Sequence, residues 1–259
     1  MLLTYIFLFI LGTILGSFLN VVIFRLPENR SVVKESSACR KCKAKLKPVE
    51  LIPIFSYLIL KGKCKSCKEP ISWQYPVVEF VTGLFFVLFA LYHQVVDLSL
   101  IDVTYVRDLI FFAGLLVIFV TDIKHYLIFD AVTYPMMLAA LALNIFIFGL
   151  SWAVLLNVLI AVLVGGGFFA VQYFISKGKW LGFGDVKMGI LMGFMLGWPN
   201  VLVAIILSYM IGSIVSIILL LTGQKKLTSK IPMGIFLTVS TVIVLLYGTQ
   251  IVNWYLGLL

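Results

Sequence analysis

The chain has 259 residues, of which 62% are apolar and 12% are charged, and its mean hydropathy is +1.13. A soluble globular domain carries about 25% charged residues, so this composition excludes that class and indicates a protein embedded in lipid. The net charge of +9 has a topological explanation, given below, and a nucleic-acid partner is not needed to account for it.

The apolar stretches are long enough to cross a bilayer as helices, because backbone in hydrocarbon must satisfy its hydrogen bonds internally. The first, at about 3–24, has no basic segment before it and no small-residue cleavage site, which predicts a retained anchor rather than a secretory signal. Together with the later stretches it predicts an all-α integral membrane fold with about eight transmembrane helices, near 3–24, 76–96, 108–121, 131–150, 152–175, 186–198, 201–222 and 231–258.

The basic residues are confined to alternate loops. Of the 20 Lys and Arg residues, all but Arg107 lie in the segments 25–75, 122–130, 176–187 and 223–230. Because short loops rich in Lys and Arg stay in the cytoplasm, these four segments are predicted to be cytoplasmic and both termini to lie outside. The predicted domains are a first helix at 1–24, a cytoplasmic loop at 25–75 and a multi-helix membrane domain at 76–259.

All four cysteines lie in the polar segment 25–75, as two CxxC pairs separated by 21 residues: Cys39, Cys42, Cys64 and Cys67. Two such pairs match the pattern in which four thiolates hold one tetrahedral zinc ion. Two disulfides are the alternative, which a reducing cytoplasm disfavours. We therefore predict a structural zinc site, since four thiolates leave no open position for a substrate.

Four carboxylates lie near predicted cytoplasmic helix ends: Glu79, Asp122, Asp130 and Asp185. A carboxylate at a membrane boundary is costly unless it is paired, hydrated or functional. Asp122 and Asp185 would lie at the same depth if their helices are neighbours. Two carboxylates that share a proton supply an acid and a base for attack of water on a peptide carbonyl.

Structural roles are the alternative for each of these groups. Asp122 could pair with Lys124, and Asp185 could pair with Lys187 or cap a helix N-terminus. Glu79 and Asp130 could be boundary anchors. The glycines at 12 and 16, and those at 189, 193 and 197, are spaced to form closely packed helix faces.

Several motifs together resemble the bacterial type IV prepilin peptidases, over nearly the whole chain. They are the segment from Gly16 to Pro27 (GSFLNVVIFRLP), the two CxxC pairs, the segment from Tyr75 to Glu79, the acids Asp122 and Asp130 eight residues apart, and the GxGD motif that ends at Asp185. The chain has Ile128-Phe129 where Ile-Pro is expected, and the segment from Lys230 to Phe236 only approximates a late family motif.

The resemblance implies a bacterial cytoplasmic-membrane enzyme with Asp122 and Asp185 as the catalytic aspartates and zinc on the four cysteines. Such enzymes cleave the leader of prepilin-like or pseudopilin precursors after a glycine, on the cytoplasmic side. Many then methylate the new N-terminus with S-adenosylmethionine, and Glu79 is the candidate residue for that step. Two other functions compete: a proton- or cation-coupled transporter using the aspartates, and an assembly scaffold that docks partners on the zinc loop.

Overall fold

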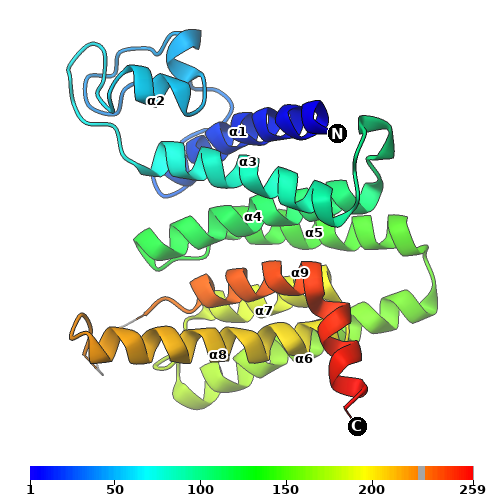
Figure 1. The fold of residues 1–259 in the computed structure, drawn as a ribbon. Helices are drawn as coiled ribbons and strands as arrows, with labels where there is room; N and C mark the ends of the chain where they lie inside the picture. Colours follow the sequence, from blue (N-terminus) through cyan, green and yellow to red (C-terminus); the bar gives the residue numbers. More distant parts are fainter. Residues whose placement is uncertain (227–230, 259) are drawn as a thin grey trace. The chain divides into compact units, whose positions relative to one another are not determined.

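The computed structural model describes residues 1–226 and 231–258, so Lys230 of the late motif lies outside the described residues. These residues are all-helical apart from loops, with no strand among them, which confirms the predicted fold class. The helices in chain order are α1 (Leu2–Arg25), η1 (Pro48–Leu51), α2 (Phe55–Ile59), α3 (Gln74–Tyr92), η2 (Leu98–Leu100), α4 (Val103–His125), α5 (Asp130–Phe148), α6 (Trp152–Ser176), α7 (Phe183–Leu196), α8 (Asn200–Leu221) and α9 (Gly234–Leu256) (Figure 1).

Each of the eight predicted apolar stretches contains a helix. Seven of them, all except α7, are long and apolar enough to cross a membrane, so the chain is a multi-pass membrane protein. Helix α7 has 14 residues, and at 1.5 Å per residue it spans about 21 Å, short of the roughly 30 Å of a hydrocarbon core. Many large apolar side chains on α1, α6 and α8 are exposed, as lipid-facing residues are.

The structure divides into two compact units, Met1–Leu109 and Ile110–Leu259, and α4 begins in the first and ends in the second. In the first unit α1 and α3 pack side by side. The predicted small-residue face of α1 makes this contact: a Cβ added to Gly16 would lie 2.7 Å from the Cα of Glu79, and one added to Gly12 would lie 2.8 Å from the Cα of Gly83. These glycines let the two backbones approach closely.

The polar segment between α1 and α3 is organised by Arg25, the buried last residue of α1. Its guanidinium donates hydrogen bonds to the carbonyls of Ser31, Val32, Glu35 and Ser36, at 2.9 to 3.3 Å. A guanidinium has five donors in a rigid fork, which suits it to collect several carbonyls. This one side chain therefore shapes the loop that leads into the first CxxC pair.

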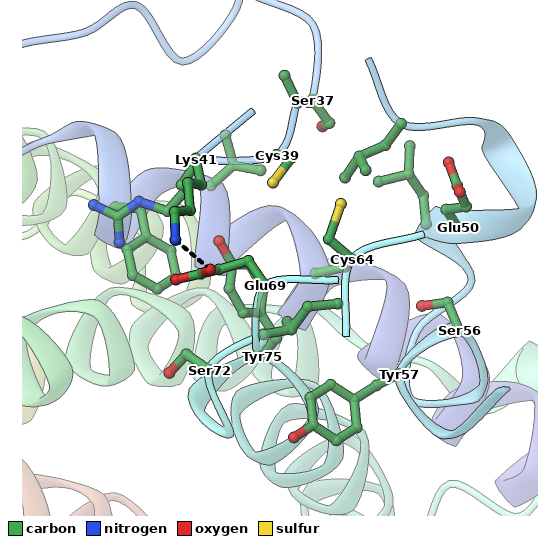
Figure 2. A pocket seen from close by; sticks show the side chains of 18 of the residues that line it. Ser37, Cys39, Lys41, Glu50, Ser56, Tyr57, Cys64, Glu69, Ser72 and Tyr75 are labelled. Carbon is green, nitrogen blue, oxygen red and sulfur yellow. Dashed lines mark hydrogen bonds and ion pairs between the residues drawn. The ribbon is translucent and has the colours of Figure 1, made fainter. Parts of the chain in front are cut away.

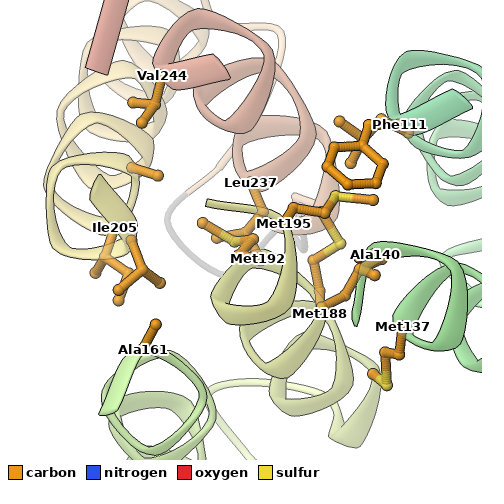
Figure 3. Close-up of a cluster of buried hydrophobic side chains, with 14 of the residues drawn as sticks. Phe111, Met137, Ala140, Ala161, Met188, Met192, Met195, Ile205, Leu237 and Val244 are labelled. Atoms are coloured by element: carbon orange, nitrogen blue, oxygen red, sulfur yellow. The ribbon is translucent and has the colours of Figure 1, made fainter. Parts of the chain in front are cut away.

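In the second unit α7 is the central helix and contacts α5, α6, α8 and α9. Figure 3 shows its side chains Met188, Met192 and Met195 surrounded by apolar side chains of the neighbouring helices. On the opposite face a Cβ added to Gly193 would lie 2.7 Å from the backbone of Ala161 in α6. Gly189 makes a similar close approach to Gly165, whereas Gly197 ends the helix with a φ of +66°. The predicted glycine face of α7 is thus confirmed at two of its three positions.

Candidate active site and metal site

Asp122 lies in the last turn of α4 and is buried, with 5% of its surface exposed. Its Oδ2 atom has no hydrogen-bond partner among the residues that the structure describes. The backbone amides of Gly234 and Ile235, in the first turn of α9, face this carboxylate. A Cβ added to Gly234 would lie 2.6 Å from Asp122 Oδ2, so only glycine fits there without displacing the carboxylate.

Asp185 lies in the first turn of α7 and is also buried, with 8% of its surface exposed. Its Oδ2 accepts a hydrogen bond of 3.0 Å from the backbone N–H of Gly182, so the predicted capping role is present. The two carboxylates lie close enough to repel each other when both are charged. The fold thus brings Asp122 and Asp185 together, from segments more than 60 residues apart in the chain.

The sequence left open an ion pair between Lys187 and Asp185, and the structure shows a different partner for Lys187. It forms an ion pair with Asp130 at the start of α5. Residues two apart on a helix point in different directions, which explains why Lys187 reaches a neighbouring helix instead of Asp185. The Asp130 side chain is 53% exposed, so it is not a member of the buried pair.

The four cysteines form one cluster, with all their Sγ atoms within 4.8 Å of one another. All four are free thiols, so no disulfide joins them. The Sγ atoms of Cys39 and Cys67 are 3.8 Å apart, and a tetrahedron of thiolates about 2.3 Å from one zinc ion has edges of about that length. The donor set and its spacing fit a tetrahedral metal ion.

The two CxxC pairs share the same local backbone. The Lys43 N–H donates to the Cys39 carbonyl, and the Lys68 N–H donates to the Cys64 carbonyl in the same way. Both lysines have a positive φ, of 58° and 62°. The backbone N–H of Cys42, turned toward the Cys39 sulfur, lowers the pKa of that thiol to about 7. Amides directed at sulfur favour the thiolate, the form that binds metal.

A cavity of about 610 Å³ lies beside the cysteine cluster in the first unit. Cys39 and Cys64 are in its wall, and their sulfur atoms point toward one another in Figure 2. Aromatic side chains line another part of it, including Tyr57 and Tyr75. Tyr75 stacks on Phe24 with ring centroids 4.8 Å apart.

Glu79 reaches this cavity from α3 and is 6% exposed. Its Oε2 accepts a hydrogen bond of 2.7 Å from the backbone N–H of Ile54, and Ser17 of α1 contacts the carboxylate as well. Ile54 has a φ of +62° and a ψ of −53°, and the next N–H bonds back to the Pro53 carbonyl. This γ-turn is strained for a β-branched residue. The strained backbone at Ile54 directs its N–H at the Glu79 carboxylate.

Sequence reasoning overlooked two buried polar residues of the first unit. Asn20 in α1 is fully buried and donates to the Tyr75 carbonyl at 3.1 Å, while it accepts from the Gln74 side chain. Arg25 holds the loop carbonyls, as described above. The signal was present for both, because an amide or a guanidinium within an apolar helix is costly and needs partners. Which partners they find depends on the tertiary contacts.

Comparisons with known proteins agree in both units. The family model of the bacterial peptidase A24 N-terminal domain matches residues 10–93, and that of the type IV leader peptidase family matches residues 109–217. A prepilin leader peptidase/N-methyltransferase of Bacillus subtilis is 33% identical over 252 residues, which cover 96% of each chain. The protein of the same description from Pseudomonas aeruginosa is 30% identical over 273 residues, 95% of this chain and 91% of that one. No solved structure matches the chain.

Proposed function

The chain belongs to the type IV leader peptidase family, and we propose that it removes the leader of prepilin-like or pseudopilin precursors by aspartyl-protease chemistry at Asp122 and Asp185. The observation that carries this proposal is that the fold buries both carboxylates, Asp122 in the last turn of α4 and Asp185 in the first turn of α7, with Ile128 packed beside both segments. Asp130, the remaining acid of the motif, is exposed and paired with Lys187.

In this mechanism one aspartate of the pair is ionised and the other is protonated. The ionised carboxylate takes a proton from a water molecule while that water attacks the scissile carbonyl carbon. The protonated carboxyl donates its proton to the carbonyl oxygen, which becomes a hydroxyl. When the tetrahedral intermediate collapses, the C–N bond breaks and the leaving amine takes a proton from one carboxyl of the pair. One hydroxyl of the intermediate gives its proton to the other carboxylate as the carbonyl re-forms, which restores the pair with one proton. Two carboxylates held together suit this work, because their repulsion favours the state that carries one shared proton.

The relatives are also described as N-methyltransferases, and we propose the cavity of the first unit as the site of that activity. S-adenosylmethionine would supply a methyl group on a sulfonium ion. The Tyr75 ring in the cavity wall offers an aromatic surface to a cation, whereas the Phe24 ring stacked on it already carries the Arg40 guanidinium, 4.5 Å from its centroid. The Glu79 carboxylate can accept the proton that the attacking amine loses when it gains the methyl group.

The metal on Cys39, Cys42, Cys64 and Cys67 is proposed to be a structural zinc ion that holds one wall of this cavity. We propose that the enzyme lies in the bacterial cytoplasmic membrane with its active site toward the cytoplasm, among anionic lipid headgroups; the confinement of Lys and Arg to alternate loops supports this orientation. A precursor protein anchored in the same membrane is the expected partner, and no nucleic acid is needed.

The test is co-expression with a prepilin-like precursor, with leader removal followed by mass spectrometry. We expect Asp122→Asn and Asp185→Asn each to abolish cleavage, because asparagine keeps the shape of aspartate and removes the ionisable group. Asp130→Asn is the matched control and is expected to cleave. Cleavage at the wild-type rate by both membrane-inserted pair variants would refute the mechanism. If Asp130→Asn also lost cleavage, the experiment would not assign the catalytic role to Asp122 and Asp185 in particular.

A further inference from the structure

The short segment between α4 and α5, residues 126–129, carries one side chain into the aspartate site. Tyr126 turns the chain out of α4 with a φ of 55°, and its N–H bonds to the Asp122 carbonyl at 3.0 Å. Two residues later Ile128 is half-buried and packs against the apolar core of the second unit. The fold therefore returns the chain to the active site immediately after Asp122.

Ile128 lies between two glycines that flank the aspartate pair. A Cβ added to Gly184, the residue before Asp185, would lie 3.2 Å from Ile128 Cβ. A Cβ added to Gly234 would lie 3.3 Å from Ile128 Cδ1 and 2.6 Å from Asp122 Oδ2. Ile128 Cδ1 and Asp122 Oδ2 thus both adjoin the same point, and the isoleucine contacts the segments that position both carboxylates.

We propose that Ile128 determines substrate specificity by excluding a side chain from the residue that supplies the scissile carbonyl. The inference rests on the proposed peptidase function and names the residue that sets its preference. The carbonyl must come within about 3 Å of the carboxylates to be attacked and protonated. In that residue the Cβ is bonded to the Cα next to the carbonyl carbon. A substrate Cβ therefore comes close to the aspartates, on the side that Ile128 borders.

Ile128 presents a fixed apolar surface beside the aspartate pair. Gly184 and Gly234 carry no Cβ, so the isoleucine packs directly against their backbones, and at Gly234 it does so next to the Asp122 carboxylate. Isoleucine is branched at Cβ and stiff at χ1, so it cannot rotate away at low cost. A substrate glycine fits against it, whereas a substrate alanine places a methyl group against the isoleucine. This arrangement agrees with the cleavage after glycine that the sequence resemblance implies.

The experiment compares two precursors that differ only in having glycine or alanine before the scissile bond. We measure kcat/KM for both with the wild-type protein and with Ile128→Ala, each in membranes. Wild type is expected to prefer glycine, and Ile128→Ala is expected to reduce that preference roughly tenfold or more, the scale on which one methyl group discriminates in a tight pocket. The gain should lie in the alanine precursor rather than in a loss of activity on glycine.

Val132→Ala is the matched control. Val132 packs against the same core, but none of its atoms is among those nearest to Gly184 or Gly234. It should leave the preference unchanged. An equal change on both precursors in Ile128→Ala, or the same shift in Val132→Ala, would overturn the proposal and make Ile128 a packing residue. If Ile128→Ala does not insert, the smaller change Ile128→Val must shift the ratio in the same direction. Failure of wild type to cleave either precursor would refute the peptidase function instead.

Discussion

The two candidate sites differ in how far apart their functional residues lie in the chain. In the first unit the four cysteines come from one polar loop and two copies of a short backbone turn. In the second unit Asp122 and Asp185 come from different helices, and Gly234 and Ile128 complete their surroundings. The cysteine cluster therefore depends on the backbone turn at each CxxC pair, whereas the aspartate pair depends on the packing of the whole helical unit.

The largest effect is expected where a backbone touches the aspartate pair. Gly234→Ala would place a methyl group 2.6 Å from Asp122 Oδ2 and displace the carboxylate. A displacement of about 1 Å can cost roughly 100-fold in rate, and we expect at least that loss of leader cleavage in a time course of precursor conversion.

Gly167→Ala in α6 provides the control for Gly234→Ala. A Cβ added at Gly167 meets nothing within 4 Å, and alanine favours helix more than glycine does, so cleavage should be unchanged. An equal loss of leader cleavage in both variants would show that the second unit tolerates no added methyl group. The contact between residue 234 and Asp122 would then not explain the loss.

The next largest effect is expected from removal of the proposed metal, which should disturb the first unit and leave the second unit intact. Cys64→Ser removes a buried ligand, and we expect the bound zinc of about one ion per chain to be lost, with the segment 26–73 becoming sensitive to protease. Methylation of the product should fall with it, while leader cleavage in the second unit persists. Metal analysis of the purified protein and mass spectrometry of the product measure the two outcomes. Simultaneous loss of cleavage would show that the units do not act separately.

Glu79→Gln separates the two activities without removing the metal. The amide keeps an oxygen for the Ile54 N–H but cannot accept a proton, so methylation should fall roughly 100-fold with cleavage and zinc content unchanged. The methylated fraction of the released N-terminus is the readout. Full methylation by this variant would exclude Glu79 as the base and leave it a structural role.

The smallest effect is expected from the ion pair that links the two CxxC turns. Lys41 Nζ lies 2.5 Å from Glu69 Oε2, and both side chains are exposed. Exposed ion pairs contribute little to stability because water and salt screen them, so Lys41→Ala should leave the stability of the loop nearly unchanged and the zinc content unchanged. Thermal unfolding with metal retained measures the change. Loss of zinc in this variant would contradict the view that the thiolates hold the two turns together.

Three features were predictable because they depend on residues that are close together in the chain. The apolar stretches predicted every long helix, since a bilayer core forces such segments to satisfy their backbone internally. The CxxC spacing predicted the cysteine cluster, since two residues between cysteines bring both sulfurs to one turn. The glycine spacings in α1 and α7 predicted close helix contacts for the same reason.

Other features required the tertiary structure, because they join segments distant in the chain whose contacts no local pattern encodes. Asp185 is the acid near Lys187 in the sequence, and only helix packing decides that Lys187 pairs instead with Asp130, 57 residues away in the chain. From its position in the sequence Glu79 could be a boundary anchor or the residue of the methyl-transfer step, and only the fold shows that it lines a cavity and accepts the Ile54 N–H. In the sequence Ile128 was visible only as the residue before Phe129, where the chain departs from the expected Ile-Pro, and its place between Gly184 and Gly234 follows from three segments meeting. Local sequence patterns were enough for the helices and the cysteine cluster, whereas packing decided which buried polar groups meet.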